Sequence, residues 1–433
     1  MNRTVAAQQI SYDDLYARWE KGNWRATEID FSIDREQWSR DFDELQRRSA
    51  LWTYSMFFHG EDSVADNLSP YIEAAPTEEQ KYFLATQQAD EARHAVLFAR
   101  FMREVAEVDA HHPLTDGGVS AGNGNGNGTA DALAHTDQHL TWGFRHVFAR
   151  LDRMAQELRK DRSKPKLAQA ITLYHLVIEA TLAQPGQHFI TESLARQGRL
   201  PGLREGVSHV ARDEQRHIAF GVKLLSDLVR DDPDCVPAIG ELLRDVLTYT
   251  TAVFVPPDFD ERYVTTFGFT LEQVYTRGAE NLEGRLRAAG VDPTTLRVGF
   301  PFDIPAAERA RRGLTLLRAG YLGERRDGVI PDREATTMLF DSLRRTIDAS
   351  QAPGARIQWD FTDAEPWYMR LDNEVPAAAP GRLDHPDLVL RCRFEDWLDV
   401  TAGRVEPWRA LVGGRIRPRG RLKVLARAPK LFG

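Results

Sequence analysis

Two short elements of the chain pair a glutamate with a histidine three residues later. They are Glu91-Ala92-Arg93-His94 and Glu214-Gln215-Arg216-His217, and a lone glutamate precedes each, Glu61 the first and Glu179 the second. On an α-helix, residues three apart lie one turn apart on the same face, so the carboxylate and the imidazole of each element can reach the same or neighbouring metal ions. We therefore predict a two-metal site with six ligands: Glu61, Glu91, His94, Glu179, Glu214 and His217.

The spacing of these residues also predicts the turns that bring them together. The midpoint between Glu61 and Glu91 is residue 76, where Pro76 is followed by Thr77 and Gln80, a proline stop and a capping box. The midpoint between the other pair is near residue 197, and residues 197–202 contain two glycines and a proline. We expect two antiparallel helix pairs that carry their ligands at a common level.

The neighbours of the predicted ligands are largely apolar, for example Phe57, Phe83, Leu97, Leu176 and Ile218. For any single glutamate, a solvated helix surface would be the simpler interpretation. A set of four carboxylates on apolar faces instead needs a compensating cation. Four helices that each present a glutamate inward, two of them with a histidine at i+3, have the ligand arrangement of ferritin-like carboxylate bundles.

Composition limits the class of protein. The 433 residues, 42% of them hydrophobic, are enough for two or three domains with apolar cores. The first nine residues have no apolar run, and no stretch of eighteen apolar residues occurs, so the sequence indicates neither secretion nor a transmembrane segment. Cys235 and Cys392 form no disulfide framework, which favours a cytoplasmic protein, and the net charge of −8 argues against nucleic acid as a partner.

The first 290 residues have helical periodicity. We predict helices over Trp38–Leu68, Thr77–Val108, 140–158, 165–196 and 203–230, with others between 237 and 289. Residues 116–129 contain alternating glycine and asparagine, which cannot bury apolar surface, so we expect a flexible surface loop there.

The pattern changes near residue 334. One helix, Thr336–Ile347, is followed by period-two segments at 357–361, 367–371 and 388–394, which indicate strands. The predicted fold class is mainly α, a ferritin-like helical bundle followed by a smaller α+β domain. The predicted boundaries are 1–295 for the bundle, 296–333 for a linker and 334–433 for the second domain.

A basic segment lies in this second domain. Arg404–Lys430 contains nine basic residues and one acidic residue, Glu406. Two interpretations stay open, a solvated face of a terminal β-strand and a contact with anionic lipid head groups.

The first 290 residues resemble the ribonucleotide reductase small subunit-like ligand-binding oxidases, a ferritin-like family with a Mn/Fe or Fe/Fe centre. The similar segments are 23–38, 60–64, 174–179 and 213–221. The resemblance implies a dioxygen-activating oxidase, a long-chain fatty acid or similar lipid ligand, an unknown electron donor and an ether cross-link between Val64 and Tyr174. From the residues alone, Val64 would be core packing and Tyr174 a hydrogen-bonded core phenol. A homodimer is one candidate assembly, and the sequence does not distinguish Mn/Fe from Fe/Fe.

Two related classes differ at single positions. A ribonucleotide reductase small subunit carries its radical tyrosine four residues after the first histidine, where this chain has Phe98. Di-iron N-oxygenases add a histidine four residues before the last glutamate, where this chain has Val210 and only the adjacent residue is a histidine, His209. The N-oxygenase stays an alternative, as does a lipid-binding or metal-binding protein without catalytic turnover.

Residues 334–431 resemble the sterol carrier protein type 2 family, in residues 394–398, Gly403, Pro407-Trp408, Gly414 and 420–423. The resemblance implies an apolar tunnel for fatty acyl or sterol chains. The tryptophan and phenylalanine content also fits an ordinary packed core.

Overall fold

The computed structural model describes residues 10–108, 128–372, 376–421, 424 and 427 of the chain. It is mainly helical, with one five-stranded sheet between residues 356 and 420, so the predicted combination of a mainly helical part and a smaller α+β part is confirmed. Two compact units are distinguished, Met1–Ile239 with Pro256–Asp292 and Gly240–Val255 with Pro293–Gly433. In the described part of the chain, no helix combines the length and the apolar character that crossing a bilayer requires.

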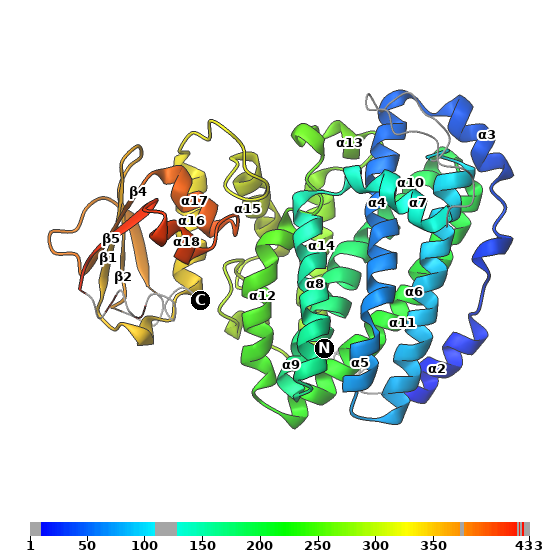
Figure 1. Ribbon diagram of the computed structural model, residues 1–433, viewed down its shortest axis with the longest axis horizontal. Helices are drawn as coiled ribbons and strands as arrows, with labels where there is room; N and C mark the ends of the chain where they lie inside the picture. The colour runs from blue at the N-terminus through cyan, green and yellow to red at the C-terminus, as the bar shows by residue number, and fades with distance from the viewer. Residues whose placement is uncertain (1–9, 109–127, 373–375, 422–423, 425–426, 428–433) are drawn as a thin grey trace. The chain divides into compact units, whose positions relative to one another are not determined.

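The first unit is a helical bundle (Figure 1). Its long helices run side by side, with α4 packed against α6 and α10 packed against α11. Its helices are α2 (Tyr12–Lys21), α3 (Ser32–Asp41), α4 (Glu44–Asn67), α5 (Ser69–Ala74), α6 (Glu78–Glu104), α7 (Gly128–Thr136), α8 (Trp142–Lys160), α9 (Lys164–Ile171), the π-helix η3 (Thr172–Ala183), α10 (Gln184–Gln197), α11 (Pro201–Asp231), α13 (Arg262–Thr265) and α14 (Leu271–Ala288); α12 (Cys235–Thr251) contributes residues to both units.

The predicted helix Trp38–Leu68 is wrong at its start, because two helices occupy this segment. Helix α3 ends at Asp41, Phe42 is extended, and α4 begins after Asp43. The Asp43 carboxylate accepts from the Gln46 backbone N–H, and the Gln46 side chain accepts from the Asp43 N–H. This capping box starts a new helix because it satisfies N–H groups that have no partner within the helix.

Both predicted turns are confirmed. Thr77 caps α6 in a capping box with Gln80. At the other turn, Gly198 ends α10 with φ +63°, a left-handed conformation that glycine adopts without a steric penalty, and Pro201 is the first residue of α11. Each turn fixes which residues of its two antiparallel helices lie side by side.

The segment predicted as one helix over 165–196 contains a change of helix type. Between α9 and α10, the twelve residues of η3 form a π-helix, in which N–H groups bond to carbonyls five residues back. Sequence periodicity does not distinguish this backbone from an α-helix.

The second unit packs helices on one face of the sheet. Phe340 of α16 stacks on Trp367 and meets Trp359 edge to face, and Trp397 of α17 contacts Trp359. The strand order is β3-β2-β1-β4-β5, and only the β1–β4 pair is parallel. The elements are α15 (Ala306–Arg318), α16 (Arg333–Thr346), β1 (Arg356–Phe361), β2 (Trp367–Arg370), β3 (Ala377–Pro380), β4 (Leu388–Cys392), α17 (Phe394–Thr401), α18 (Pro407–Val412) and β5 (Ile416–Gly420).

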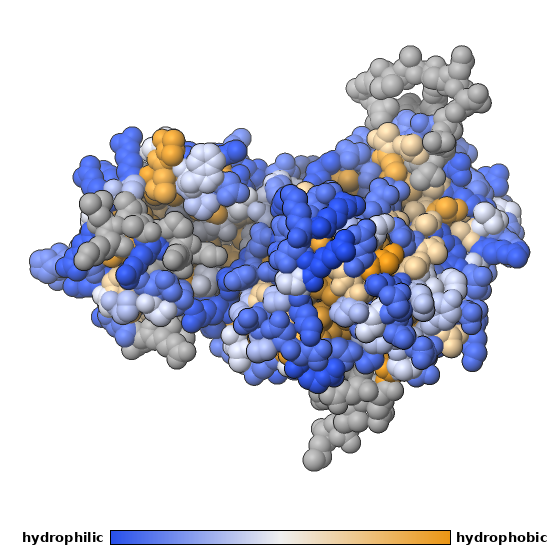
Figure 2. Space-filling model, turned by 60° about the horizontal axis from the view of Figure 1, so that its bottom comes forward, coloured by the Kyte–Doolittle hydropathy of each residue, from blue (hydrophilic) through white to orange (hydrophobic). Residues whose placement is uncertain are grey.

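The three predicted strands correspond to β1, β2 and β4, whereas β3 has no period-two signal in its Ala-Ala-Ala-Pro sequence. Helix α15 lies in the segment predicted as a linker, and the three predicted domain boundaries stay a prediction. Most of the predicted flexible loop, 116–129, lies outside the described residues. Hydrophilic side chains cover most of the surface visible in Figure 2, with small apolar areas between them.

Candidate metal centre

The six predicted ligands meet inside the first unit. One group of ligand atoms, all within 4.8 Å of one another, comes from Glu61, Glu91, His94 and Glu214; a second comes from Glu91, Glu179, Glu214 and His217. All six side chains are buried. Two glutamates, Glu91 and Glu214, belong to both groups, so the two sets of ligand atoms overlap at their carboxylates.

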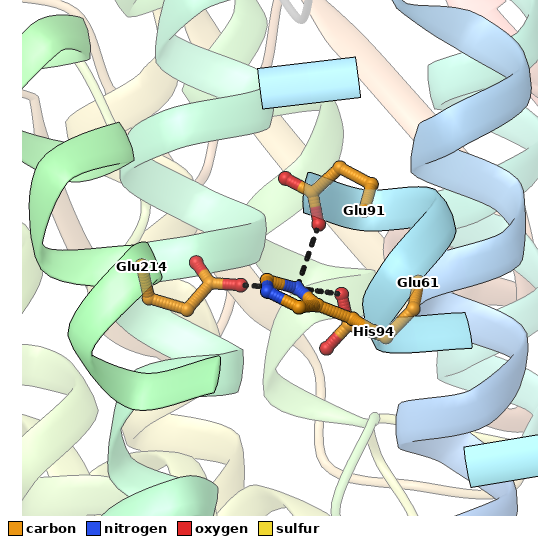
Figure 3. Close-up of side chains that lie close together, drawn as sticks. All are labelled: Glu61, Glu91, His94 and Glu214. Atoms are coloured by element: carbon orange, nitrogen blue, oxygen red, sulfur yellow. Dashed lines mark hydrogen bonds and ion pairs between the residues drawn. The ribbon is translucent and has the colours of Figure 1, made fainter. Parts of the chain in front are cut away.

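The two imidazoles present the same nitrogen to the carboxylates. His94 Nδ1 lies 3.2 Å from Glu61 Oε2 and 3.3 Å from Glu91 Oε2. His217 Nδ1 lies 3.1 Å from Glu91 Oε1 and 3.4 Å from Glu179 Oε1. Figure 3 shows the imidazole of His94 between the carboxylates that α4, α6 and α11 contribute.

The opposite nitrogen of each imidazole faces an aspartate on the other helix. His94 of α6 has Nε2 3.3 Å from Asp213 of α11, and His217 of α11 has Nε2 3.1 Å from Asp90 of α6. An aspartate that accepts from Nε2–H leaves the lone pair of Nδ1 directed at the carboxylates. The two Glu-x-x-His elements therefore orient each other's histidines.

These aspartates are held by an arginine and two tryptophans. Arg216 donates to Asp90 at 2.7 Å and to Asp213 at 2.8 Å, so one guanidinium joins the two helices. The indole N–H of Trp24 donates to Asp213 at 2.7 Å, and that of Trp19 donates to Asp90 at 2.9 Å.

The sequence interpretation missed these supporting residues. Their signal is that both elements extend to Asp-Glu-x-Arg-His, with an aspartate before the glutamate and an arginine before the histidine. Arg93 pairs with Asp90 as Arg216 pairs with Asp213, in both cases three residues apart on one helix.

Burial shifts the protonation of the carboxylates. It raises the pKa of Glu61 to about 7 and that of Glu179 to about 8. Burial and the nearby charge of Glu179 raise the pKa of Glu214 well above its usual value. Burial also acts on Glu91, but His217 and His94 outweigh it and hold the pKa of this carboxyl well below its usual value. Four carboxylates this close cannot all ionise without added positive charge.

The histidines show the opposite balance. Burial alone would lower the pKa of His94, but Glu61 and Asp213 raise it well above its usual value. The pKa of His217 is raised in the same way by Glu91 and Glu179 against the effect of burial. Protons on the imidazoles add positive charge, and protons on the carboxyl groups remove negative charge. Bound metal ions would otherwise balance the charge of the cluster.

The donor atoms fit two metal ions. Among the described residues, three buried carboxylate oxygens, Oε2 of Glu91, Glu179 and Glu214, have no hydrogen-bond partner of good geometry, and neither has His217 Nδ1. Leaving such groups buried without partners is costly. Carboxylate and imidazole donors suit manganese and iron, so coordination would satisfy these atoms.

The π-helix η3 brings Tyr174 to the same cluster. Its hydroxyl donates to Glu91 Oε1 at 2.6 Å. Gln87 Nε2 donates to Tyr174 Oη at 3.0 Å and to Glu179 Oε1 at 2.8 Å, and Gln87 Oε1 lies 3.2 Å from His175 Nε2. Residues five apart are hydrogen-bonded neighbours in a π-helix, so Tyr174 and Glu179 can face one side together.

Val64, Phe98 and Val210, which the sequence also singled out, are buried as well. Val64 lies on α4, three residues after Glu61, and its cross-link to Tyr174 stays a prediction. Phe98 stacks on Phe57 and supplies no hydroxyl. Val210 is fully buried, whereas the adjacent His209 is partly exposed.

The bundle and the cluster define a ferritin-like helical protein with a candidate dinuclear carboxylate centre. No protein-family model matches the chain. The fold is similar to that of solved R2-like ligand-binding oxidases. A mutant of such an oxidase, with an anaerobically reconstituted Mn/Fe cofactor, has a TM-score of 0.53 and 20% identity over 65% of this chain and 93% of that chain. The oxidase from Sulfolobus acidocaldarius has a TM-score of 0.50 and 24% identity over 64% of this chain and 90% of that chain. The likeness confirms the predicted ferritin-like fold.

Proposed function

We propose that this protein is an oxidoreductase that uses dioxygen at a dinuclear Mn/Fe or Fe/Fe centre. The observation that carries the proposal is the pair of overlapping groups of buried ligand atoms, with Glu91 and Glu214 in both. The similar solved oxidases with a reconstituted Mn/Fe cofactor support this metal content. A bound metal pair would supply the electrons for reducing dioxygen, a reaction that carboxylate and imidazole ligands suit.

The residues around the centre have separable roles in this proposal. Glu61, Glu91 and His94 would hold one metal ion, and Glu179, Glu214 and His217 the other. Glu91 and Glu214 would be within reach of both ions, because each contributes ligand atoms to both groups.

Tyr174 and the aspartates Asp90 and Asp213 have supporting roles. Burial and Glu91 raise the pKa of Tyr174, so its phenol stays protonated and donates to Glu91. Asp90 and Asp213 act as positioning residues, because each accepts from the Nε2 nitrogen of a proposed histidine ligand.

Metal analysis combined with oxygen consumption tests the function. The purified protein, reconstituted anaerobically with Mn(II) and Fe(II), is expected to bind two metal ions per chain and to consume dioxygen in stoichiometric amounts when air is admitted. The variant with both Glu91→Ala and Glu214→Ala should lose the metals and the oxygen consumption but keep its helical circular dichroism.

The matched control changes exposed glutamates on the same helices, Glu79→Ala on α6 and Glu205→Ala on α11. This control should bind metals like the unchanged protein. Full metal content in the Glu91→Ala, Glu214→Ala variant would refute the ligand assignment. Two bound metals without oxygen consumption would favour a metal-binding or lipid-binding protein without turnover.

We also propose that Val64 and Tyr174 become joined by an ether bond. The bond joins Val64 Cβ to Tyr174 Oη, removes one hydrogen atom from each residue and passes two electrons to an oxidant derived from dioxygen. Peptide mass spectrometry after aerobic reconstitution should find the two peptides linked with a loss of two hydrogens. Tyr174→Phe should abolish the linked species, and its absence from the aerobic unchanged protein would sink the idea.

The proposed ligand is a long-chain fatty acid or similar lipid. The resemblance of the first 290 residues to ligand-binding oxidases and of residues 334–431 to sterol carrier proteins supports this substrate class. Organic extraction of the purified protein followed by mass spectrometry should recover a lipid at up to one equivalent per chain. A reducing electron donor, a homodimeric assembly and a cytoplasmic location belong to the same proposal.

A further inference from the structure

Helix α18 of the second unit exposes apolar side chains. Trp408 is 58% exposed, Leu411 is 40% exposed and Val412 is 82% exposed. At 100° per residue, these three fall on one side of the helix, opposite the fully buried Ala410. Helix α18 thus faces the protein interior with Ala410 and exposes its larger apolar side chains to solvent.

The segment around α18 is strongly basic. Residues 404–421 contain six arginines and one acidic residue, Glu406. Arg415 pairs with Asp396 and Arg421 with Asp387. Arg417 and Arg419 of β5 are both exposed, and neither has a carboxylate partner among the described residues.

The arginines of β5 follow the apolar residues of α18 closely in the chain. A turn at Gly413 and Gly414 leads from α18 directly into β5, and the Arg415 N–H donates to the carbonyl of Ala410. The Arg417 side chain folds back to this turn, since its Nε donates to the Gly414 carbonyl at 3.1 Å. We call Trp408, Arg409, Leu411, Val412, Arg417 and Arg419 the α18–β5 surface.

This surface is unfavourable by itself. Arg417 lies directly opposite Arg391 in the antiparallel β4–β5 pair, and like charges in that position repel each other. Among the described residues, Arg391 has one carboxylate within ion-pair distance, Asp360 at 3.9 Å. An exposed tryptophan near arginines without carboxylate partners is complementary to the interface of an anionic bilayer. There, indole rings lie at the level of the head groups and arginines contact the negatively charged lipids.

We propose that the α18–β5 surface docks on an anionic lipid bilayer. The three apolar side chains of α18 would enter the head-group region, and Arg409, Arg417 and Arg419 would contact lipid phosphates. This peripheral contact is independent of the proposed oxidase activity and of any lipid ligand inside the protein.

Vesicle flotation with the full chain tests the docking. The protein should float with vesicles that contain phosphatidylglycerol and should float much less with pure phosphatidylcholine vesicles or at high salt. The pair Arg417→Gln and Arg419→Gln should weaken binding about 30-fold, since each arginine near an anionic surface contributes about 1 kcal/mol. The pair Trp408→Ser and Val412→Ser should weaken it about tenfold or more.

Matched controls come from elsewhere in the chain. Ile330→Ser changes an apolar residue that is 80% exposed, and Arg153→Gln with Arg159→Gln removes two exposed arginines of α8. Both controls should bind vesicles like the unchanged protein. Equal binding to both vesicle types, or no loss in either α18–β5 variant, would overturn the proposal. A dimer that Trp408→Ser and Val412→Ser convert to a monomer, with no vesicle binding, would assign the surface to a second copy instead.

Discussion

At the scale of single residues, Gln87 connects Tyr174 and His175 to Glu179, one of the proposed metal ligands. Its amide nitrogen donates to Tyr174 and Glu179, and its oxygen faces His175. Burial and His217 lower the pKa of His175 to about 3, so this imidazole is neutral and can donate Nε2–H to the amide. One uncharged side chain thus holds three residues of η3 against α6.

Replacing this amide should be costly for stability. Gln87→Leu leaves three buried polar groups with fewer partners, and we expect it to lower the free energy of unfolding by about 2–3 kcal/mol. Urea denaturation of the metal-free protein measures this loss. The control is Gln156→Leu, the same substitution at an exposed position of α8, which should change stability by less than about 0.5 kcal/mol. Equal losses in both variants would contradict the role of Gln87.

At the scale of elements, α6 and α11 support each other's histidines. Because Asp90 and Asp213 each reach across to the opposite helix, both helices must be in register before either imidazole is oriented. Arg216, in contact with both aspartates, strengthens this dependence.

We expect Asp90→Asn and Asp213→Asn each to weaken metal binding about 10- to 100-fold. A neutral amide oxygen accepts a weaker hydrogen bond from Nε2–H than a carboxylate does, so it orients the imidazole less well. Competition with a chelator measures the affinity. Asp231→Asn, at the exposed end of α11, should leave it unchanged. If all three variants bind metal alike, the aspartates do not position the ligands.

The packing of η3 against α11 depends on a glycine. A Cβ on Gly221 would lie 2.3 Å from His175 Cβ, so an alanine there would push the π-helix away from α11. Gly221→Ala should therefore lower the free energy of unfolding by about 1–3 kcal/mol. Gly284→Ala, in α14 with open space around it, should instead raise stability by about 0.5–1 kcal/mol. Thermal denaturation distinguishes the two signs, and a stabilised Gly221→Ala variant would contradict this packing.

At the scale of the whole molecule, the buried cluster couples stability to pH and to metal. Glu61 and Glu179 have pKa values of about 7 and about 8 in the folded, metal-free protein, above the usual value of 4.5, and the pKa values of His94 and His217 are raised as well. Each of these groups binds more protons in the folded state than in the unfolded state. Their stabilisation is present at low pH and is lost as the pH rises.

We therefore expect the metal-free protein to lose stability between about pH 5 and pH 8, by about 1.4 kcal/mol per pH unit for each extra proton held in the folded state. Urea denaturation in chelator at several pH values measures the slope. The pair Glu61→Gln and Glu179→Gln should reduce it, whereas Glu79→Gln with Glu205→Gln should not. Metal affinity should rise over the same range because binding displaces these protons. A slope that the first pair leaves unchanged would contradict the assignment.

The sequence alone determined which glutamates and histidines form the buried cluster and where the turns between their helices lie. Those features are local: a histidine three residues after a glutamate shares its helix face, Thr77 and Gln80 form a capping box, and Gly198 adopts the conformation that ends a helix. Spacing and capping chemistry suffice to predict such features.

Only the tertiary structure decided how the elements meet. The π-helix η3 packs closely against Gly221 and is hydrogen-bonded to Gln87, contacts between distant segments that local periodicity does not predict. Asp90 and Asp213 act on the opposite helix, so their roles depend on the register between α6 and α11. The physical reason is that a helix face is set by a few neighbouring residues, whereas the partner of a buried polar group is set by contacts between segments far apart in the chain.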